Sequence, residues 1–179
     1  MRIVLLMVLL LTGVTTFLHA QKGSGTGADS LPPPPPMTVG YTITEAPGWK
    51  KTDTLINSNY ITVLISPEDS VNDKFRENLN IIMEPCGDIS LVEYFEAAET
   101  QFNKLPNFQL YGVSDTTING LSFKRVDYSI QNEQIAADIT TYLMIHDEVA
   151  YIFTCSALKG DRLRWKPVYE QMITSFKFD

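Results

Sequence analysis

The chain has 179 residues, enough for one ordinary domain, and its 14 basic residues against 21 acidic ones give a net charge of −7. An acidic protein of this kind repels nucleic acids and anionic lipid surfaces, so neither is expected as a partner.

Residues 1–20 have the pattern of a secretory signal peptide. Arg2 precedes the apolar run Ile3–Leu11, and Leu18-His19-Ala20 is similar to a cleavage site of small residues in front of Gln21. The alternative is an uncleaved membrane anchor, but the apolar segment is interrupted by Thr and Gly and is shorter than the ~20 residues of a membrane span. We expect cleavage, a periplasmic or extracellular mature protein and no membrane span in it. Loss of Arg2 leaves 13 of the 14 basic residues against 21 acidic ones, a net charge of −8.

Residues 21–40, QKGSGTGADSLPPPPPMTVG, are rich in Gly, Ser and Pro and carry almost no apolar side chains. Such a segment cannot offset the entropy of ordering, so we predict a disordered linker. Within it, Pro32–Pro36 are expected to form a stiff polyproline II rod of ~15 Å. The segment is interpreted as a spacer that holds the domain away from a membrane or cell wall, and the alternative is a docking peptide for an aromatic-lined groove.

Residues 41–179 have the dense, regular pattern of a folded domain. Three strands are predicted in its first part, each an alternating or β-branched run: Tyr41–Glu45, Tyr60–Ser66 and Asn78–Glu84. Ala46–Trp49 turns the chain after the first of them, and the polar segment Lys50–Asn59 is interpreted as a loop.

The period then changes from that of a strand to that of a helix. Ser90 and Glu93 form a capping box at its start, and Pro106 ends it. Between them, apolar residues recur at alternating steps of four and three positions, which is one helical stripe: Leu91, Phe95, Ala98, Phe102 and Leu105.

Extended chain returns after this helix. Phe108–Val113 predicts a strand, and Asn119-Gly120 is typical of a two-residue hairpin turn that leads into Leu121–Gln131. Within that last strand the apolar residues shift from odd to even positions, so we expect a bulge near Lys124-Arg125. The polar segment Gln131–Ala137 is interpreted as a loop.

The end of the chain predicts a hairpin and a second helix. Asp138–His146 and Val149–Ala157 pair through a tight turn at Asp147-Glu148. Pro167 fits the closing helix only in its first turn. The apolar stripe of that helix is Trp165, Val168, Tyr169, Met172, Ile173 and Phe176. Because short turns join strands antiparallel and each helix has one apolar stripe, the predicted class is α+β: an antiparallel β-sheet flanked by two main helices, an α/β/α sandwich.

The order of these pieces is similar to that of a known family. The matching positions are turns, caps and core residues: Pro47-Gly48-Trp49, Asn78-Leu79-Asn80, Ser90-Leu91 with Tyr94, Gly120, Tyr151-Ile152-Phe153-Thr154 and Ser175-Phe176. From about Tyr41 to Phe178 the chain resembles the PsbP-like superfamily. This superfamily includes the extrinsic oxygen-evolving subunit of photosystem II and bacterial secreted proteins of unknown function; at fold level the chain also resembles the Ran-binding nuclear-import factor.

The resemblance implies a sheet between helices and a role in binding or assembly rather than catalysis. Photosystem members have been linked to metal sites built partly from histidine, but the predicted mature chain has only His146. A metal site with one histidine would be weak, and a nucleophile would have no other histidine as its base. We therefore expect a solvated turn at His146, Asp147 and Glu148, with no catalytic, metal-binding or cofactor-binding residues and no cofactor. The alternative is a small extracytoplasmic hydrolase or metal-dependent enzyme that uses His146 with nearby acids.

Cys86 and Cys155 are the only cysteines, and an exported chain meets oxidising conditions. Cys155 shares the odd-numbered face of Tyr151 and Phe153 and is expected in the core, whereas Cys86 follows a strand end. They can form a disulfide if their Cα atoms come within ~7 Å. A Cys86–Cys155 disulfide and two unlinked thiols, one of them buried, remain equal alternatives.

These observations favour an exported, non-catalytic binding or assembly-accessory protein of the bacterial envelope. We expect a monomer whose partner is an envelope protein or a small ligand. The expected contact surfaces are the face of the sheet that no helix covers and the loops Lys50–Asn59 and Gln131–Ala137. A third possibility is a structural spacer that works through residues 21–40.

Overall fold

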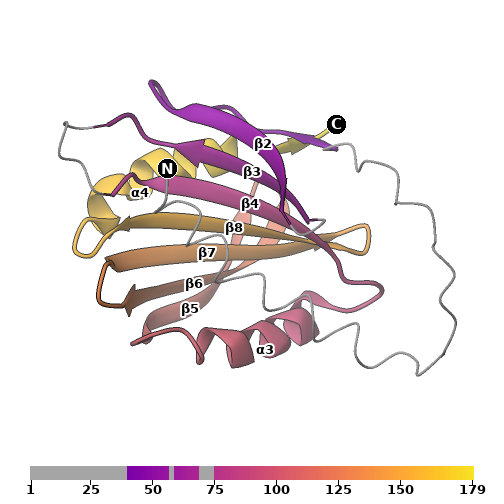
Figure 1. Ribbon diagram of the computed structural model, residues 1–179. Coiled ribbons are helices and arrows are strands. Elements are labelled where there is room, and N and C mark those ends of the chain that lie inside the picture. Colours follow the sequence, from indigo (N-terminus) through magenta and orange to yellow (C-terminus); the bar gives the residue numbers. More distant parts are fainter. Residues whose placement is uncertain (1–39, 57–58, 69–74) are drawn as a thin grey trace, which may run out of the picture.

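The computed structural model describes residues 40–56, 59–68 and 75–179 (Figure 1). The predicted signal peptide, residues 1–20, and the predicted linker up to residue 39 lie outside the described residues. In chain order the elements are β1 (Tyr41–Thr42), β2 (Lys50–Ile56), β3 (Asn59–Ile65), β4 (Asn78–Pro85), α3 (Leu91–Phe102), β5 (Gln109–Ile118), β6 (Leu121–Gln131), β7 (Ala136–His146), β8 (Val149–Leu158), α4 (Arg162–Thr174) and β9 (Lys177–Phe178).

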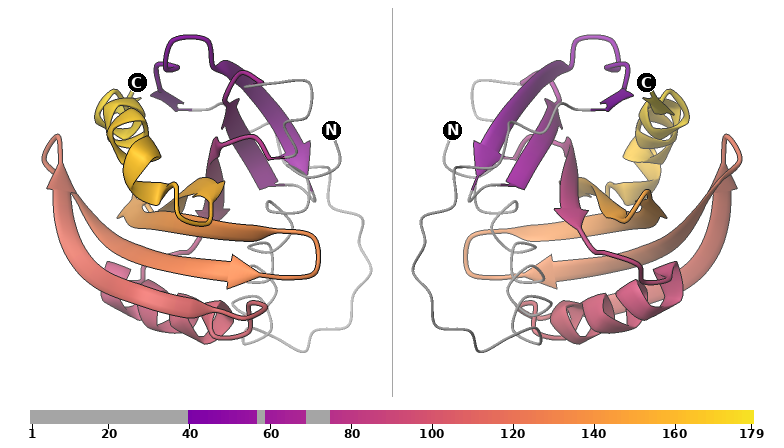
Figure 2. Two further views of the ribbon diagram at one scale, coloured as in Figure 1. Left: turned by 90° about the vertical axis from the view of Figure 1, so that its left-hand side faces the viewer. Right: turned by 90° about the vertical axis from the view of Figure 1, so that its right-hand side faces the viewer.

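One antiparallel sheet of seven strands, in the order β2-β3-β4-β8-β7-β6-β5, forms the middle layer. Helix α3 lies on one face of this sheet and α4 on the other (Figure 2). The predicted α+β class with two flanking helices is therefore confirmed. The expectation that one face carries no helix is wrong, because each helix has one apolar stripe to bury and the two stripes cover opposite faces.

The sheet separates two apolar cores. On the α4 side, Tyr169, Met172 and Ile173 of the helix pack with buried side chains of β4, β7 and β8. On the α3 side, Tyr94 and Phe102 pack with other side chains of the same strands and of β6. We call these the α4-side core and the α3-side core. Since neighbouring residues of a strand point to opposite faces, each central strand contributes to both cores.

Strand β6 has no bulge at Lys124-Arg125, contrary to the prediction. Its pairing with β7 runs without interruption from Lys124 to Gln131. Phe123 is buried in the α4-side core, whereas Val126 and Tyr128 are buried in the α3-side core. The two cores cover different ends of β6, so its apolar residues change parity without a change of register. The irregularity lies instead in β5, where Tyr111 is an extra residue.

Two further strand predictions need correction. Lys50–Ile56 is not a loop but the edge strand β2, paired residue by residue with β3. Strand β2 lies at the edge of the sheet, where charged side chains can reach solvent. These charged residues gave the sequence the appearance of a polar loop. The predicted strand Tyr41–Glu45 is only two residues long in the structure, and it pairs with β9 rather than with the main sheet.

The predicted turns are confirmed. Asn119 and Gly120 have φ values of 52° and 79°, and Asp147 and Glu148 have 49° and 62°. Both pairs have the left-handed backbone of the tight turns that match the twist of a hairpin. At the earlier turn, Gly48 has a φ of 79° and the Trp49 N–H donates to the Ala46 carbonyl at 3.0 Å.

The helix starts follow local rules, with one correction. The Ser90 hydroxyl accepts from the Glu93 N–H at 3.2 Å, and the Ser90 N–H donates to Glu93 Oε2 at 2.8 Å, so the capping box is confirmed. Pro167 lies in the second turn of α4, not the first, because the helix begins at Arg162. Because proline has no backbone N–H, Pro167 cannot donate to the carbonyl of Leu163, four residues earlier. The Leu163 side chain is exposed at the start of the helix. Within the described ranges, no helix is long and apolar enough to span a membrane.

A buried carboxyl group links α3 to the sheet. The Tyr94 hydroxyl donates to Glu84 Oε2 at 2.9 Å, and both side chains are buried. Glu84 Oε1 has no hydrogen-bond partner in the described part of the chain. Burial raises the pKa of Glu84, and the hydrogen bond from Tyr94 offsets only part of this effect. The folded protein therefore holds this proton more tightly than the unfolded chain does.

We predict that Glu84 weakens the folded state as the pH rises. Its pKa in the folded state exceeds its ordinary value of 4.5, so its stabilising contribution is full below that value and is lost as the pH rises through the folded-state pKa. Relative to wild type, E84Q should gain about 1.4 kcal/mol of unfolding free energy for each pH unit between those two pKa values. Urea unfolding of both proteins from pH 4 to pH 8 measures this difference, and parallel pH profiles would contradict it.

Candidate functional site

His146 lies at the end of the β7–β8 hairpin. Its ring stacks on Phe178 with 3.9 Å between ring centroids, and its Nε2 lies 3.4 Å from Asp147 Oδ2. The side chains of His146 and Asp147 are 41% and 89% exposed. In the described ranges no three His, Cys, Asp or Glu side chains form a group that could hold a metal ion. The enzyme alternative depends on His146. The structure places this residue in an aromatic stack with Phe178, next to the exposed carboxylate of Asp147.

Cys86 and Cys155 are both free. Cys155 is buried in the α4-side core, whereas Cys86 packs against the α3-side core, so the sheet separates them. Cys155 also pairs with Leu79, near the start of β4, whereas Cys86 follows the end of that strand. The Cys86–Cys155 disulfide is therefore the wrong alternative, and the structure has two unlinked thiols, one of them buried.

The thiols should differ in reactivity. Burial raises the pKa of both Cys86 and Cys155, and Cys155 is the more deeply buried. Without reductant, iodoacetamide should modify Cys86 slowly in the folded protein and Cys155 only after unfolding in urea. Intact-mass measurement counts the modified thiols. A protein that takes up no reagent in urea until it is reduced would contain the disulfide and would contradict this prediction.

The surface is hollowed where the N-terminus of α4 faces the beginning of β5. A cavity of about 450 Å³ opens there, lined by Leu110, Tyr111, Asp138, Gly160, Arg162 and Leu163. A second cavity of about 10 Å³, the size of one water molecule, lies next to it under α4 and shares Asp138 and Arg162 with the first. We call the two together the β5–α4 groove.

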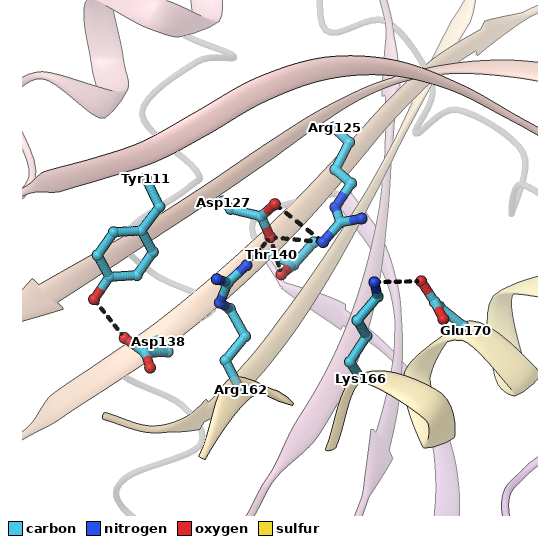
Figure 3. A network of polar contacts seen from close by, with 8 residues as sticks. All are labelled: Tyr111, Arg125, Asp127, Asp138, Thr140, Arg162, Lys166 and Glu170. Carbon is cyan, nitrogen blue, oxygen red and sulfur yellow. Dashed lines mark hydrogen bonds and ion pairs between the residues drawn. The ribbon is translucent and has the colours of Figure 1, made fainter. Parts of the chain in front are cut away.

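Asp127 of β6 is the centre of a charge network that adjoins this groove and shares Thr140 and Arg162 with its lining (Figure 3). It accepts a hydrogen bond from the Thr140 hydroxyl at 2.6 Å, and its carboxylate lies 2.9 Å from Arg162 Nη1 and 3.0 Å from Arg125 Nη2. Burial by itself would raise the pKa of Asp127, but the hydrogen bonds from Thr140 and Arg125 and the two guanidinium charges lower it. The carboxylate is therefore held ionised, far from the proton affinity that a general acid or base needs at neutral pH.

Asp138 of β7 holds the outer part of the groove. It accepts hydrogen bonds from the Tyr111 hydroxyl and from the Gly160 N–H, both at 2.8 Å (Figure 3). The Arg162 guanidinium lies over the Tyr111 ring, 5.3 Å from its centre. The extra residue in β5 thus turns the Tyr111 side chain toward α4, where a carboxylate and a cation fix it. Tyr111 is therefore held from two sides, although its side chain remains partly exposed.

The rim of the groove is apolar and exposed. Leu163 of α4 is 72% exposed, and Leu110 and Tyr111 of β5 are 48% and 42% exposed. Val113 and Leu158 are also exposed, but they pair with Val126 and Ala137 of the α3-side core and therefore lie on the other face of the sheet. Leu110, Tyr111 and Leu163 are thus three of the seven large hydrophobic side chains that are exposed in the described part of the chain, and Leu55 and Val92 lie elsewhere. Apolar side chains that gather at one exposed place indicate an interaction site.

The sequence prediction missed this site. Its charged residues come from β6, β7 and α4, and only the lateral pairing of strands brings them together. The usable signal was the charged stretch Lys124, Arg125 and Asp127 inside an otherwise apolar strand. Of the predicted contact loops, Lys50–Asn59 is mostly strand β2, and Gln131–Ala137 is a tight turn in which the Asn132 side chain accepts two backbone N–H bonds.

The fold is shared with solved structures. A comparison of the sequence with models of protein families finds no match, and neither does a comparison with curated proteins. A protein of unknown function, PA94 of Pseudomonas aeruginosa, is 17% identical, with 70% of this chain and 94% of that chain covered and a TM-score of 0.57. Cyanobacterial PsbP of Synechocystis sp. PCC 6803 is 12% identical, with 78% and 87% covered and a TM-score of 0.53. The domain has a PsbP-like fold.

A third protein with this PsbP-like fold is LpqN of Mycobacterium tuberculosis, which is involved in cell envelope biogenesis. It is 15% identical, with 76% of this chain and 89% of that chain covered and a TM-score of 0.52. At identities of 12–17% the likeness shows the fold alone. A function for this chain therefore has to be argued from its own residues.

We predict that Asp127 stabilises the fold more than an exposed ion pair does. D127A leaves the half-buried Arg125 without its carboxylate, which should lower the unfolding free energy by about 2 kcal/mol. D115A is the matched control, because Asp115 is 76% exposed and pairs with Lys124 at 2.6 Å, and it should cost less than about 1 kcal/mol. Urea unfolding at pH 7 compares the two variants, and equal losses would contradict the structural role of the network.

Proposed function

We propose that the protein is an exported, non-catalytic binding or assembly-accessory protein of the bacterial envelope, and that it contacts its partner through the β5–α4 groove. The observation that carries this proposal is the combination of an exposed apolar rim with a floor in which hydrogen-bond donors hold Asp138, next to the carboxylate of Asp127, which is held by two cations. Such a floor orients the rim side chains and presents no free acid or base. The rim supplies apolar area, and a few rigid side chains of this kind dominate the affinity of many interfaces.

The proposed compartment rests on the beginning of the chain. Residues 1–20 have the pattern of a signal peptide and residues 21–40 that of a linker, so residues 41–179 form the working domain. The involvement of LpqN in cell envelope biogenesis supports the same assignment. The partner is an envelope protein or a small ligand, and the protein acts as a monomer until it binds.

A matched pair of variants tests the groove. Leu163 and Val92 are both exposed apolar residues at the second position of a helix, but only Leu163 lines the groove. An Asp at this position is favoured by the helix dipole, so neither L163D nor V92D should disturb folding. In a pull-down from solubilised native envelope with the mature chain as bait, partners retained by wild type and V92D should fall at least tenfold with L163D.

The same experiment can overturn the proposal. Partners that bind wild type and L163D equally would place the contact elsewhere on the molecule. Thermal unfolding of both variants confirms that their folds are intact before the comparison is made.

A further inference from the structure

The sheet ends on two edge strands that differ in their protection. An open edge offers unpaired backbone N–H and C=O groups to other strands, and proteins block it with short strands and charged side chains. Strand β2 follows this rule, since three of its seven residues are charged: Lys50, Lys51 and Asp53. The other edge, β5, does not follow it.

Strand β5 is ten residues long and carries one charged residue, Asp115. The Lys124 ammonium lies 2.6 Å from the Asp115 carboxylate and neutralises it. The strand leaves Leu110, Tyr111 and Val113 exposed. A long, nearly neutral edge with exposed apolar side chains is the kind that accepts an added strand.

The hairpin turn fixes which backbone groups of β5 point outward. Ile118 and Leu121 flank a two-residue turn, so they exchange both hydrogen bonds. Pairs alternate along an antiparallel ladder, so the N–H and C=O groups of Val113, Asp115 and Thr117 point away from β6. In the described ranges no strand pairs with β5 on that side.

The side chains beside this edge leave room for a partner. Gly112, Ser114 and Thr116 pair with the β6 residues Asp127, Arg125 and Phe123, whose side chains lie on the α4 side. All three side chains are small, so they leave space beside β5 on the α4 side of the sheet. At the beginning of β5 the groove takes over, with Tyr111 and Leu163 on its two walls.

We propose that β5 binds an extended segment of another protein, which joins the sheet as an additional antiparallel or parallel strand. This inference rests on the proposed function and names the class of partner: a segment of about five to seven residues with alternating apolar side chains, one of which packs on the rim of the groove. A second copy of the chain does not suit this edge, because each mature copy carries a net charge of −8 and the two would repel.

A variant that removes one outward N–H tests the strand pairing. V113P deletes that donor, whereas V113A shortens the same side chain and keeps it. The probe is a phage-displayed library of random twelve-residue peptides, selected on the mature chain. By fluorescence anisotropy, an enriched peptide should bind V113A within about threefold of wild type and V113P at least about tenfold more weakly.

A second measurement does not depend on how well V113P folds. Each backbone N of the enriched peptide is methylated in turn, and the peptides are tested on the wild-type protein. Strand addition requires that methylation weakens binding at every second position, because only alternate N–H groups of the peptide face β5.

Three results would overturn the proposal. The first is a library that yields no enriched peptide, and the second is a methylation profile without a two-residue period. The third is a dimer, seen by light scattering, that V113P separates into monomers, since β5 would then hold a second copy. A peptide that V113P binds normally and L163D does not would overturn strand addition while the proposed function of the groove stands.

Discussion

The middle strands of the sheet, β4, β8 and β7, are buried on both of their faces. Removal of apolar surface from water is the main driving force of folding, and a sheet that is apolar on both sides must be covered on both sides. Helices α3 and α4 provide this cover, each with a single apolar stripe. The change of parity in β6, the position of Cys86 and Cys155 and the absence of a helix-free face all follow from these two separate cores.

The groove lies where this cover ends. Toward the beginning of β5 and the N-terminus of α4, polar side chains replace apolar ones on the α4 side of the sheet. Half-buried charges are costly unless they are paired, and here Asp127 is paired with Arg125 and Arg162. The network therefore closes the edge of the core and, at the same time, holds Arg162 against the Tyr111 ring. The residues that stabilise this edge of the core therefore also hold the surface through which we propose that the protein binds.

The comparisons with solved structures concern the fold, whereas the groove concerns the proposed function. Proteins that share 12–17% identity with this chain keep its PsbP-like fold, because turns, caps and core patterns can be met by many sequences. The proposed binding surface depends on particular side chains at one corner of the sheet. His146, which carried the enzyme alternative, stacks on Phe178 at the opposite end of β7, away from this corner.

The sequence by itself determined the local structure: both tight turns, the capping box at Ser90, the long strands of the second half and the α+β class. These depend on residues close together in the chain, whose backbone preferences and periodicity act locally. The β2 edge, the true position of the bulge at Tyr111, the separation of Cys86 from Cys155 and the whole β5–α4 groove were decided only by the tertiary structure. Each of them depends on which strands lie side by side, and the free energy that selects this arrangement comes from burial between segments far apart in the chain.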